Sequence, residues 1–293
     1  MPERIVARPF FRPSSAELRY LPECPRMVDG KLVWVSIQYG PEAKDGGINF
    51  LDLAARTNVH HRLPGRPGFF VTTEQPGVLL IGLERRLVLY DVAARRITTT
   101  LAHVPDNPRI LINDGIAIPG GVLFGTKDVQ FQEPIAALYR YHFASGALRE
   151  LLGGQTCSNG KLLRGSRLID IDSAARTITE YLYDGALERV RLIAPAESLP
   201  AIPDGLRPAP GGESIVVAFV NLDAGADGLA QQIRIADGVV LTEWIFPGAP
   251  RVTCPEYVHG LGWLFTTAVE GAAAPEAGTI FVGPISDLSH EAR

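Results

Sequence analysis

Short apolar runs alternate with glycine-containing turns along the whole chain. The runs are rich in Val, Ile, Phe, Tyr and Trp, and they are KLVWVSI (31–37), GVLLIGL (77–83), RLVLYDV (86–92), GVLFGT (121–126), ALYRYHF (137–143), SIVVAFV (214–220), GWLFTTA (262–268) and GTIFVG (278–283). Dipeptides typical of tight turns separate them, namely Asp29-Gly30, Asp114-Gly115, Gly120-Gly121, Asp184-Gly185, Gly211-Gly212 and Asp237-Gly238. Runs this short, bounded by such residues, are typical of strands joined as hairpins. Helical periodicity is confined to two short stretches, residues 15–21 and 225–232, so the pattern predicts an all-β fold.

Polar residues that precede a hairpin recur at a regular interval. They are Glu23, Asn113, Asn159 and Asp204, and the intervals between them are 90, 46 and 45 residues. A repeat of about 45 residues predicts two further units, one starting near residue 68 and one near residue 250. Six such units are typical of a six-bladed β-propeller with four-stranded antiparallel blades, which we expect to form a single domain over residues 1–293. The segment ERIVARPFF (3–11) is expected to pair beside GTIFVG and complete the last blade.

The four repeated polar residues are candidates for a shared site. In a propeller the first strand of each blade lines the central channel, so residues at one phase of different blades meet around the axis. All four offer oxygen atoms and two are carboxylates, which suits one hard divalent cation, Ca²⁺ first, with Mg²⁺, Mn²⁺ or Zn²⁺ as alternatives. Alternatively, Asn-Gly and Asp-Gly are simply turn residues. That alternative does not explain the common phase, or Glu23, which lies between Pro22 and Cys24.

Composition and charge narrow the classes of partner. Hydrophobic residues make up 46% and charged residues 20% of the chain, which is enough for a sizeable core and too apolar for intrinsic disorder. The net charge is −4 and only four of the 28 basic residues are Lys, so we expect no nucleic-acid partner. No apolar stretch reaches about 18 residues and the N-terminus lacks a continuous apolar segment, so neither a membrane partner nor a secretory leader is expected. Three widely spaced cysteines without a CxxC motif indicate a reducing, cytoplasmic location.

As an ordered set, the motifs resemble those of the SMP-30/gluconolactonase/regucalcin-like family of six-bladed propellers, over about residues 20–270. The matching motifs are Glu23-Cys24-Pro25 before KLVWVSI, Asn113-Asp114-Gly115 before Gly125-Thr126, Asn159-Gly160 before Asp172-Ser173, and Pro203-Asp204-Gly205 before SIVVAF. The resemblance implies that Glu23, Asn159 and Asp204 are metal ligands. It also implies that Asn113 lies near the metal and faces the substrate.

Three positions depart from the family pattern. Sugar-lactonases of the family usually carry Arg two residues before the Asn of Asn-Asp-Gly, and here that residue is Leu111. After Gly125-Thr126 the usual apolar residue is replaced by Lys127, and Gln130 lies near the position of the usual Glu. We therefore expect Leu111, Lys127 and Gln130 to contact a substrate that has an apolar portion and an anionic group, rather than a plain aldonolactone.

The predicted function is metal-dependent hydrolysis of a small cyclic ester. A bound cation would polarise the lactone carbonyl, and Asp204, or hydroxide at the cation, would act as the catalytic base. Two other classes stay open: a non-hydrolytic enzyme on the same scaffold, such as an isomerase or cyclase, and a metal-binding propeller without catalysis. The expected partner is a small-molecule substrate. Glycine-rich nucleotide loops and catalytic-triad motifs do not occur in the chain, so nucleotide and triad chemistry are not expected.

Overall fold

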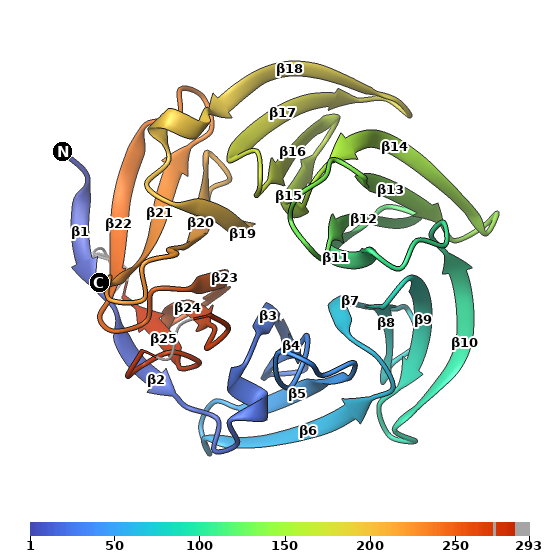
Figure 1. Cartoon of the computed structure of the whole chain (residues 1–293), viewed down its shortest axis with the longest axis horizontal. Helices are drawn as coiled ribbons and strands as arrows, with labels where there is room; N and C mark the ends of the chain where they lie inside the picture. The colour runs from blue at the N-terminus through green and yellow to red at the C-terminus, as the bar shows by residue number, and fades with distance from the viewer. Residues whose placement is uncertain (272–273, 285–293) are drawn as a thin grey trace, which may run out of the picture.

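Six sheets, each built on four antiparallel strands, are arranged as blades around a central axis (Figure 1). The computed structural model describes residues 1–271 and 274–284. In the first five blades the strands follow chain order from the axis outward, so the first strand of each lies innermost. The structure is therefore the predicted all-β six-bladed propeller. Helical turns in the described residues are limited to η1 (Glu17–Arg19) and η2 (Ala196–Ser198).

The strands of the six blades have the following bounds. Blade one comprises β3 (Pro22–Val28), β4 (Lys31–Ser36), β5 (Gly46–Asp52) and β6 (Thr57–Leu63). Blade two comprises β7 (Pro67–Thr72), β8 (Val78–Leu83), β9 (Arg86–Asp91) and β10 (Arg96–His103). Blade three comprises β11 (Ile110–Ile118), β12 (Gly121–Asp128), β13 (Ala136–His142) and β14 (Ala147–Gln155). Blade four comprises β15 (Ser158–Arg164), β16 (Arg167–Asp172), β17 (Thr177–Tyr183) and β18 (Leu187–Ala194). Blade five comprises β19 (Ile202–Pro208), β20 (Ser214–Val220), β21 (Gly228–Arg234) and β22 (Val240–Phe246). Blade six comprises β23 (Val252–Val258), β24 (Gly262–Thr267) and β25 (Ile280–Gly283) with β2 (Arg8–Phe11). The innermost strands begin close to the predicted repeat positions.

The N-terminal segment closes the ring. Strand β2 pairs antiparallel with β25, so the predicted completion of the last blade is confirmed. The preceding strand β1 (Glu3–Val6) pairs parallel with β22 and adds a fifth strand to blade five, which the sequence pattern did not predict. One segment therefore joins two neighbouring blades and covers an edge of each, which protects edges that could otherwise pair with another chain.

Two local predictions were wrong. Residues 225–232, a helical candidate, instead lead into strand β21, where Ala230 pairs with both Ala218 and Trp244 and is fully buried. A short helical pattern has a costly nucleus, and pairing on both sides of the strand stabilises the alternative. The dipeptide Asp114-Gly115 is not a turn but lies inside β11.

Each innermost strand carries a register irregularity near its start. The irregularities lie at Glu23/Arg26, Pro67/Phe69, Ile112/Gly115, Ser158/Lys161, Pro203/Leu206 and Val252/Cys254. Such a bulge leaves residues out of the ladder and redirects their side chains. At the same phase, glycine lets neighbouring inner strands approach: a Cβ on Gly160 would lie 2.5 Å from the backbone nitrogen of Leu206, and one on Gly205 would lie 2.5 Å from the sulfur of Cys254. The pairs Asn159-Gly160 and Asp204-Gly205 therefore let inner strands approach and do not form turns, whereas Asp29-Gly30 and Asp237-Gly238 lie in turns as predicted.

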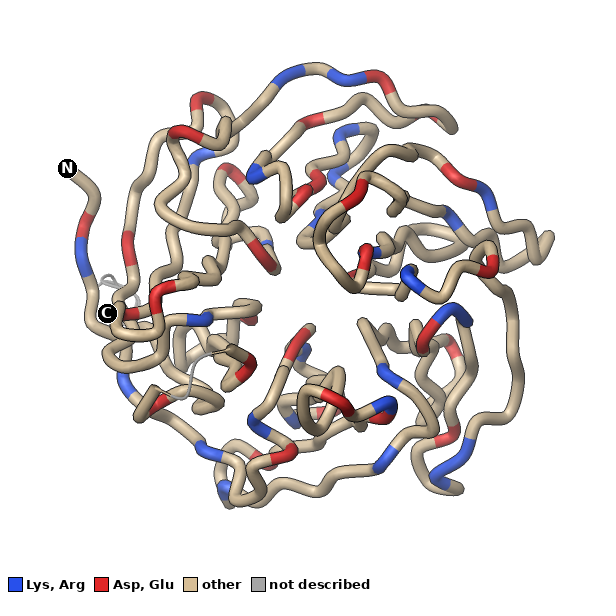
Figure 2. The backbone as a smooth tube through the Cα atoms, viewed as in Figure 1, with Lys and Arg blue, Asp and Glu red and all other residues tan. Residues whose placement is uncertain are grey.

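Apolar side chains fill the space between blades. Phe69 of β7 and Phe124 of β12 are fully buried, and their rings stack at a centroid distance of 6.0 Å. The rings of Trp244 of β22 and Phe265 of β24 make a tilted contact at a centroid distance of 5.6 Å. Packing between neighbouring blades holds the inner strands in a fixed ring. Around the outer strands Lys and Arg are interspersed with Asp and Glu (Figure 2). No described helix has the length and apolar character to cross a membrane.

Candidate functional site

The starts of the inner strands meet at one mouth of the axis, where they surround a cavity of about 570 Å³. The four repeated polar residues, Glu23, Asn113, Asn159 and Asp204, all line this cavity. The predicted convergence of side chains from blades one, three, four and five is therefore present. Asn113, Asn159 and Asp204 are buried, with relative exposures of 6%, 7% and 7%, while Glu23 is half-buried.

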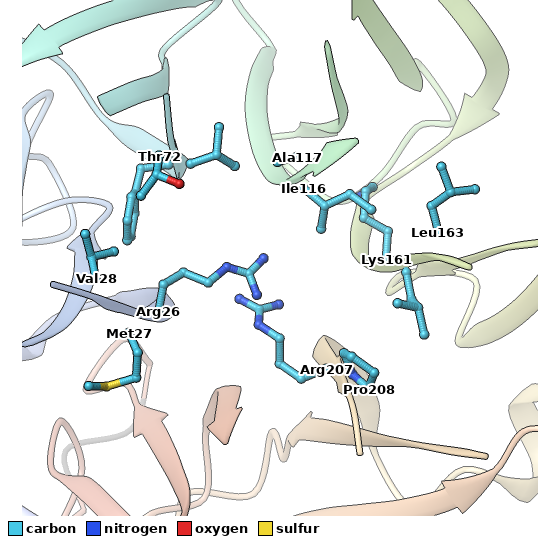
Figure 3. A pocket seen from close by; sticks show the side chains of 13 residues that line it. Arg26, Met27, Val28, Thr72, Ile116, Ala117, Lys161, Leu163, Arg207 and Pro208 are labelled. Carbon is cyan, nitrogen blue, oxygen red and sulfur yellow. The ribbon is translucent and has the colours of Figure 1, made fainter. Parts of the chain in front are cut away.

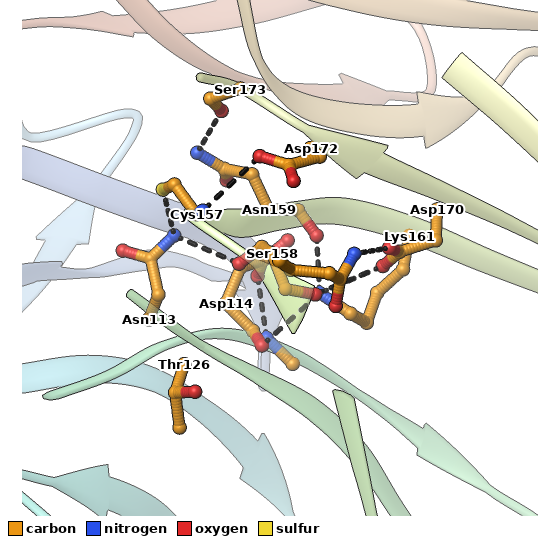
Figure 4. Close-up of polar contacts among 12 residues, drawn as sticks. Asn113, Asp114, Thr126, Cys157, Ser158, Asn159, Lys161, Asp170, Asp172 and Ser173 are labelled. Carbon is orange, nitrogen blue, oxygen red and sulfur yellow. Dashed lines mark hydrogen bonds and ion pairs between the residues drawn. The ribbon is translucent and has the colours of Figure 1, made fainter. Parts of the chain in front are cut away.

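Hydrogen bonds orient the two amide side chains (Figure 4). The Asn159 amide nitrogen donates to the carboxylate of Asp204, and to the Ser173 hydroxyl at 3.0 Å. The Asn113 amide nitrogen donates to the backbone carbonyl of Ser158 at 3.1 Å. With the nitrogens engaged, the carbonyl oxygen of each amide is the atom available to a ligand in the cavity.

The Asp172-Ser173 motif supports this arrangement. The Asp172 carboxylate accepts the backbone N–H groups of Thr156 at 3.1 Å and Cys157 at 3.2 Å, which fixes the start of β15 just before Asn159. Ser173 then accepts from Asn159 itself. The motif therefore positions a site residue from the neighbouring strand, a role that the sequence alone did not assign.

Burial and mutual proximity disfavour the ionised forms of the Glu23 and Asp204 carboxylates. Burial, and then proximity to Asp204 and Asp114, raises the pKa of Glu23 well above its usual value. Burial raises the pKa of Asp204 to about 7, although Lys127 and the hydrogen bond from Asn159 act in the opposite direction. Two neighbouring carboxylates repel when both are ionised, and a cation between them would offset that cost.

The donor set fits a hard divalent cation. It consists of two carboxylates, from Glu23 and Asp204, and the amide oxygen of Asn159, and Ca²⁺ favours such oxygen ligands. Within residues 1–271 and 274–284, no group of three or more His, Cys, Asp or Glu side chains is arranged to hold a metal. Any cation at this mouth would therefore depend on the amide as well as the acids, with water or substrate completing its coordination.

The wall of the cavity combines cations with apolar side chains. Lys127, as the predicted role requires, lines the cavity, and its ammonium lies 5.7 Å from the centroid of the Phe131 ring. Phe131 and Leu222 also line it, although 52% and 65% of their surfaces are exposed. Large apolar side chains left open at the rim of a cavity are typical of ligand-binding sites.

Arg251 is a site residue that the sequence reading missed. It lines the cavity together with Glu270, and its buried Nε has no hydrogen-bond partner among the described residues. Arg251 directly precedes β23, at the start of the sixth repeat, so the repeat phase was the signal that could have identified it. The lining of the cavity therefore includes two cations, Lys127 and Arg251, as well as the acids Glu23, Asp204 and Glu270.

The structure places two predicted substrate contacts elsewhere. Leu111 is buried in β11 with 3% exposure, opposite Lys127 in the strand register. Gln130 is exposed in the turn after β12. Neither is among the described residues that line the cavity, so direct contact of Leu111 or Gln130 with a substrate stays a prediction.

The Asp128 carboxylate holds the turn that follows β12. It accepts the backbone N–H groups of Gln130 at 3.1 Å, Gln132 at 3.0 Å and Glu133 at 3.0 Å, and it pairs with the Arg109 guanidinium at 2.6 Å. The same turn carries Phe131 to the cavity rim. Asp128 is thus a positioning residue for the apolar wall.

Fold and site together define a six-bladed propeller with an acid-and-amide cavity at one mouth of its axis. The chain belongs to the SMP-30/gluconolactonase/LRE-like family, whose model matches residues 21–269. This finding confirms the resemblance inferred from the ordered motifs.

Individual relatives agree with this membership. An L-arabinolactonase from Azospirillum brasilense is 30% identical over 234 residues, which cover 75% of each chain. Among solved structures, a calcium-binding regucalcin from Agrobacterium tumefaciens has a TM-score of 0.79 at 19% identity, with 97% of this chain and 96% of that chain covered. A gluconolactonase from Xanthomonas campestris has a TM-score of 0.69 at 15% identity, with 97% of each chain covered. At these identities the two structures show a common fold.

Proposed function

We propose that the protein is a divalent-cation-dependent lactonase that hydrolyses a small cyclic ester. The observation that carries the proposal is the convergence of Glu23, Asn159 and Asp204 from three blades on the floor of one open cavity. Membership of a family that includes gluconolactonases, and 30% identity to an L-arabinolactonase, support the same reaction class.

Glu23, Asn159 and Asp204 would hold the cation, with Ca²⁺ as the first candidate. When bound, such an ion supplies a Lewis acid that polarises the ester carbonyl and lowers the pKa of water. Asp204 is the candidate base: its carboxylate would accept a proton from attacking water and return it to the departing ring oxygen. Asn113, beside this group, orients the substrate through its amide carbonyl.

The cavity wall indicates the substrate class. Lys127 and Arg251 can pair with an anionic group, and the exposed Phe131 and Leu222 can cover an apolar portion. A lactone that carries both a carboxylate and a hydrocarbon segment therefore fits better than a plain aldonolactone, whose hydroxyl groups need several fixed polar partners.

A cytoplasmic location accords with the thiols. Cys24, Cys157 and Cys254 are all buried and free. Burial raises the pKa of the Cys157 thiol to about 12, which keeps it protonated and unreactive at neutral pH. These residues therefore need no oxidising compartment.

A lactone panel tests the proposal. Proton release is used to measure hydrolysis of three groups of substrate: plain aldonolactones, neutral alkyl lactones, and alkyl lactones that carry a carboxylate. Each is measured before chelation, after chelation, and after Ca²⁺, Mg²⁺, Mn²⁺ or Zn²⁺ is added back. We expect cation-dependent opening of the carboxylated lactones first. Absence of hydrolysis of every lactone with every cation would contradict the proposal, and turnover that survives complete chelation would exclude the role of the cation.

A further inference from the structure

The opposite mouth of the axis holds a second cavity. Because the six inner strands all run in the same direction, their ends meet at the mouth remote from Glu23 and Asp204. The cavity there has a volume of about 320 Å³, and its lining includes the ends of β3, β7, β11, β15 and β19. It shares no lining residue with the first cavity.

Two arginines dominate this second cavity. Arg26 of β3 and Arg207 of β19 extend their guanidinium groups toward each other at its centre (Figure 3). Arg207 is 4% exposed and rigidly held: it donates to the Glu256 carboxylate at 3.3 Å and to the backbone carbonyls of Leu206 at 2.7 Å and Pro25 at 3.3 Å. It is therefore an immobile, preorganised cation.

Arg26 is held much less completely. Its nearest acidic partner among the described residues is again Glu256, at 3.9 Å, which is beyond hydrogen-bonding distance. Glu256 is already engaged, since its other oxygen accepts the backbone N–H of Met27 at 3.0 Å. One carboxylate thus serves two guanidinium groups, and the donors of Arg26 remain open toward the cavity.

Other charges near this mouth do not neutralise the arginine pair. Lys161 lines the cavity but is paired with the buried Asp170 at 3.6 Å. Asp114 is buried and does not line the second cavity. The cavity itself is left with an excess of positive charge between two facing guanidinium groups.

We propose that this second cavity is a binding site for a small organic anion, held by its carboxylate or phosphate group between Arg26 and Arg207. The open N–H donors of Arg26, beside the fixed positive charge of Arg207, match the oxygens of such groups. Apart from Thr72 and the paired Lys161, the rest of the wall is apolar, with Met27, Phe70, Ile116 and Leu163 among its residues, and would cover a short hydrocarbon portion of the ligand. The site is independent of the proposed hydrolysis, because its residues lie at the other end of the strands.

Calorimetric titration of the purified protein, in chloride-free buffer, tests the site with two probes. Inorganic phosphate represents the phosphate class and hexanoate the carboxylate class, and the tighter probe identifies the preferred group. We expect saturable binding of one anion per chain at this site, weakened at least about tenfold in Arg26→Gln, since a charge-assisted pair is worth more than 1.4 kcal/mol. Arg164→Gln is the matched control, because Arg164 is an exposed guanidinium at the end of β15 outside the cavity lining, and binding should be unchanged.

The first cavity also contains cations, so Lys127→Ala decides between the two mouths. Binding that survives Lys127→Ala and is lost in Arg26→Gln supports the proposal, and the reverse result overturns it. Absence of saturable binding of both probes also overturns it. If Arg26→Gln does not fold, anomalous diffraction from wild-type crystals soaked in bromide decides the matter. A peak between Arg26 and Arg207 supports the site, and peaks confined to other places contradict it.

Discussion

The two mouths of the propeller axis are built from the same strands and have opposite chemistry. In β3, Glu23 lies at one mouth and Arg26 at the other; in β19, Asp204 and Arg207 repeat that order. Each pair is separated by three positions, or about 10 Å along a strand. The acidic end lies where the ladders are irregular, and the basic end where pairing is regular again. A single inner strand therefore contributes side chains of opposite charge to the two mouths.

The layer between the mouths keeps them distinct. Lys161 and Asp170 are almost fully buried and lie 3.6 Å apart, and Lys161 also donates to the backbone carbonyl of Asn159. Lys161 lies in β15, the strand that also carries Asn159 of the first cavity, and Lys161 itself lines the second cavity. Residues at either mouth can therefore act on a ligand, whereas residues in the layer between the mouths stabilise the ring of inner strands.

The largest effect is expected from removing the acidic end. Asp204→Asn keeps the shape but removes a ligand charge and the candidate base, so turnover of the best lactone should fall at least about 10²-fold. Thermal melting should change little, because the residue lies at a cavity and not in the apolar core. Asp106→Asn, at a side chain that is 92% exposed, is the control. Near-normal turnover by Asp204→Asn would remove Asp204 from the catalytic machinery.

The buried pair in the middle should matter for stability. Lys161→Met leaves Asp170 buried without its cation, and breaking a buried pair in this way typically costs about 3–5 kcal/mol of unfolding free energy. Chemical denaturation of Lys161→Met and of the exposed control Lys44→Met provides the comparison. Equal stability of the two variants would show that this pair does not hold the central layer.

Lys127 sharpens the contrast within the first cavity. Loss of its charge in Lys127→Ala should raise the KM for a carboxylated lactone about tenfold, in line with one charge-assisted hydrogen bond, and leave the KM for a neutral lactone almost unchanged. The exposed Lys31 supplies the control substitution, Lys31→Ala. A parallel rise for both substrates would show that Lys127 shapes the cavity rather than binding the anionic group.

The smallest expected effect concerns the turn behind Phe131. The Arg109 guanidinium holds the pKa of Asp128 well below its usual value, so the folded chain releases this proton more readily than the unfolded chain. The stability that Asp128 adds is therefore complete above about pH 4, the pKa of the unfolded chain, and is lost progressively as the pH falls from there toward the lower pKa of the folded chain. In Asp128→Asn the decline of the melting temperature between about pH 5 and pH 3 should be shallower than in the wild type and in the exposed control Asp184→Asn. An unchanged slope would refute this role.

The sequence pattern predicted the fold well because a propeller repeats one physical unit. Runs of apolar residues at a regular interval specify blades, and polar residues at one phase specify a common mouth, so the convergence of Glu23, Asn113, Asn159 and Asp204 followed from periodicity. The parallel pairing of β1 and the strand at residues 228–234 did not follow, since both depend on partners far away in the chain.

The site was predicted only in part, because the register irregularities are not encoded in the spacing of apolar residues. They lie where Glu23, Asn113, Asn159 and Asp204 reach the cavity. Arg251 escaped notice since nothing local distinguishes it from a surface arginine. The second cavity escaped for the same reason: Arg26 and Arg207 are 181 positions apart and meet only when the ring closes.

Direct titration of the metal-stripped protein with Ca²⁺ tests the central claim, that three blades build one cation site. We expect one ion per chain, a melting temperature that rises with the ion concentration because the ligand binds the folded state, and loss of binding in Glu23→Gln but not in Arg26→Gln. If Ca²⁺, Mg²⁺, Mn²⁺ and Zn²⁺ all fail to bind, or if Glu23→Gln binds as well as the wild type, the acidic mouth is not a cation site and the account is contradicted.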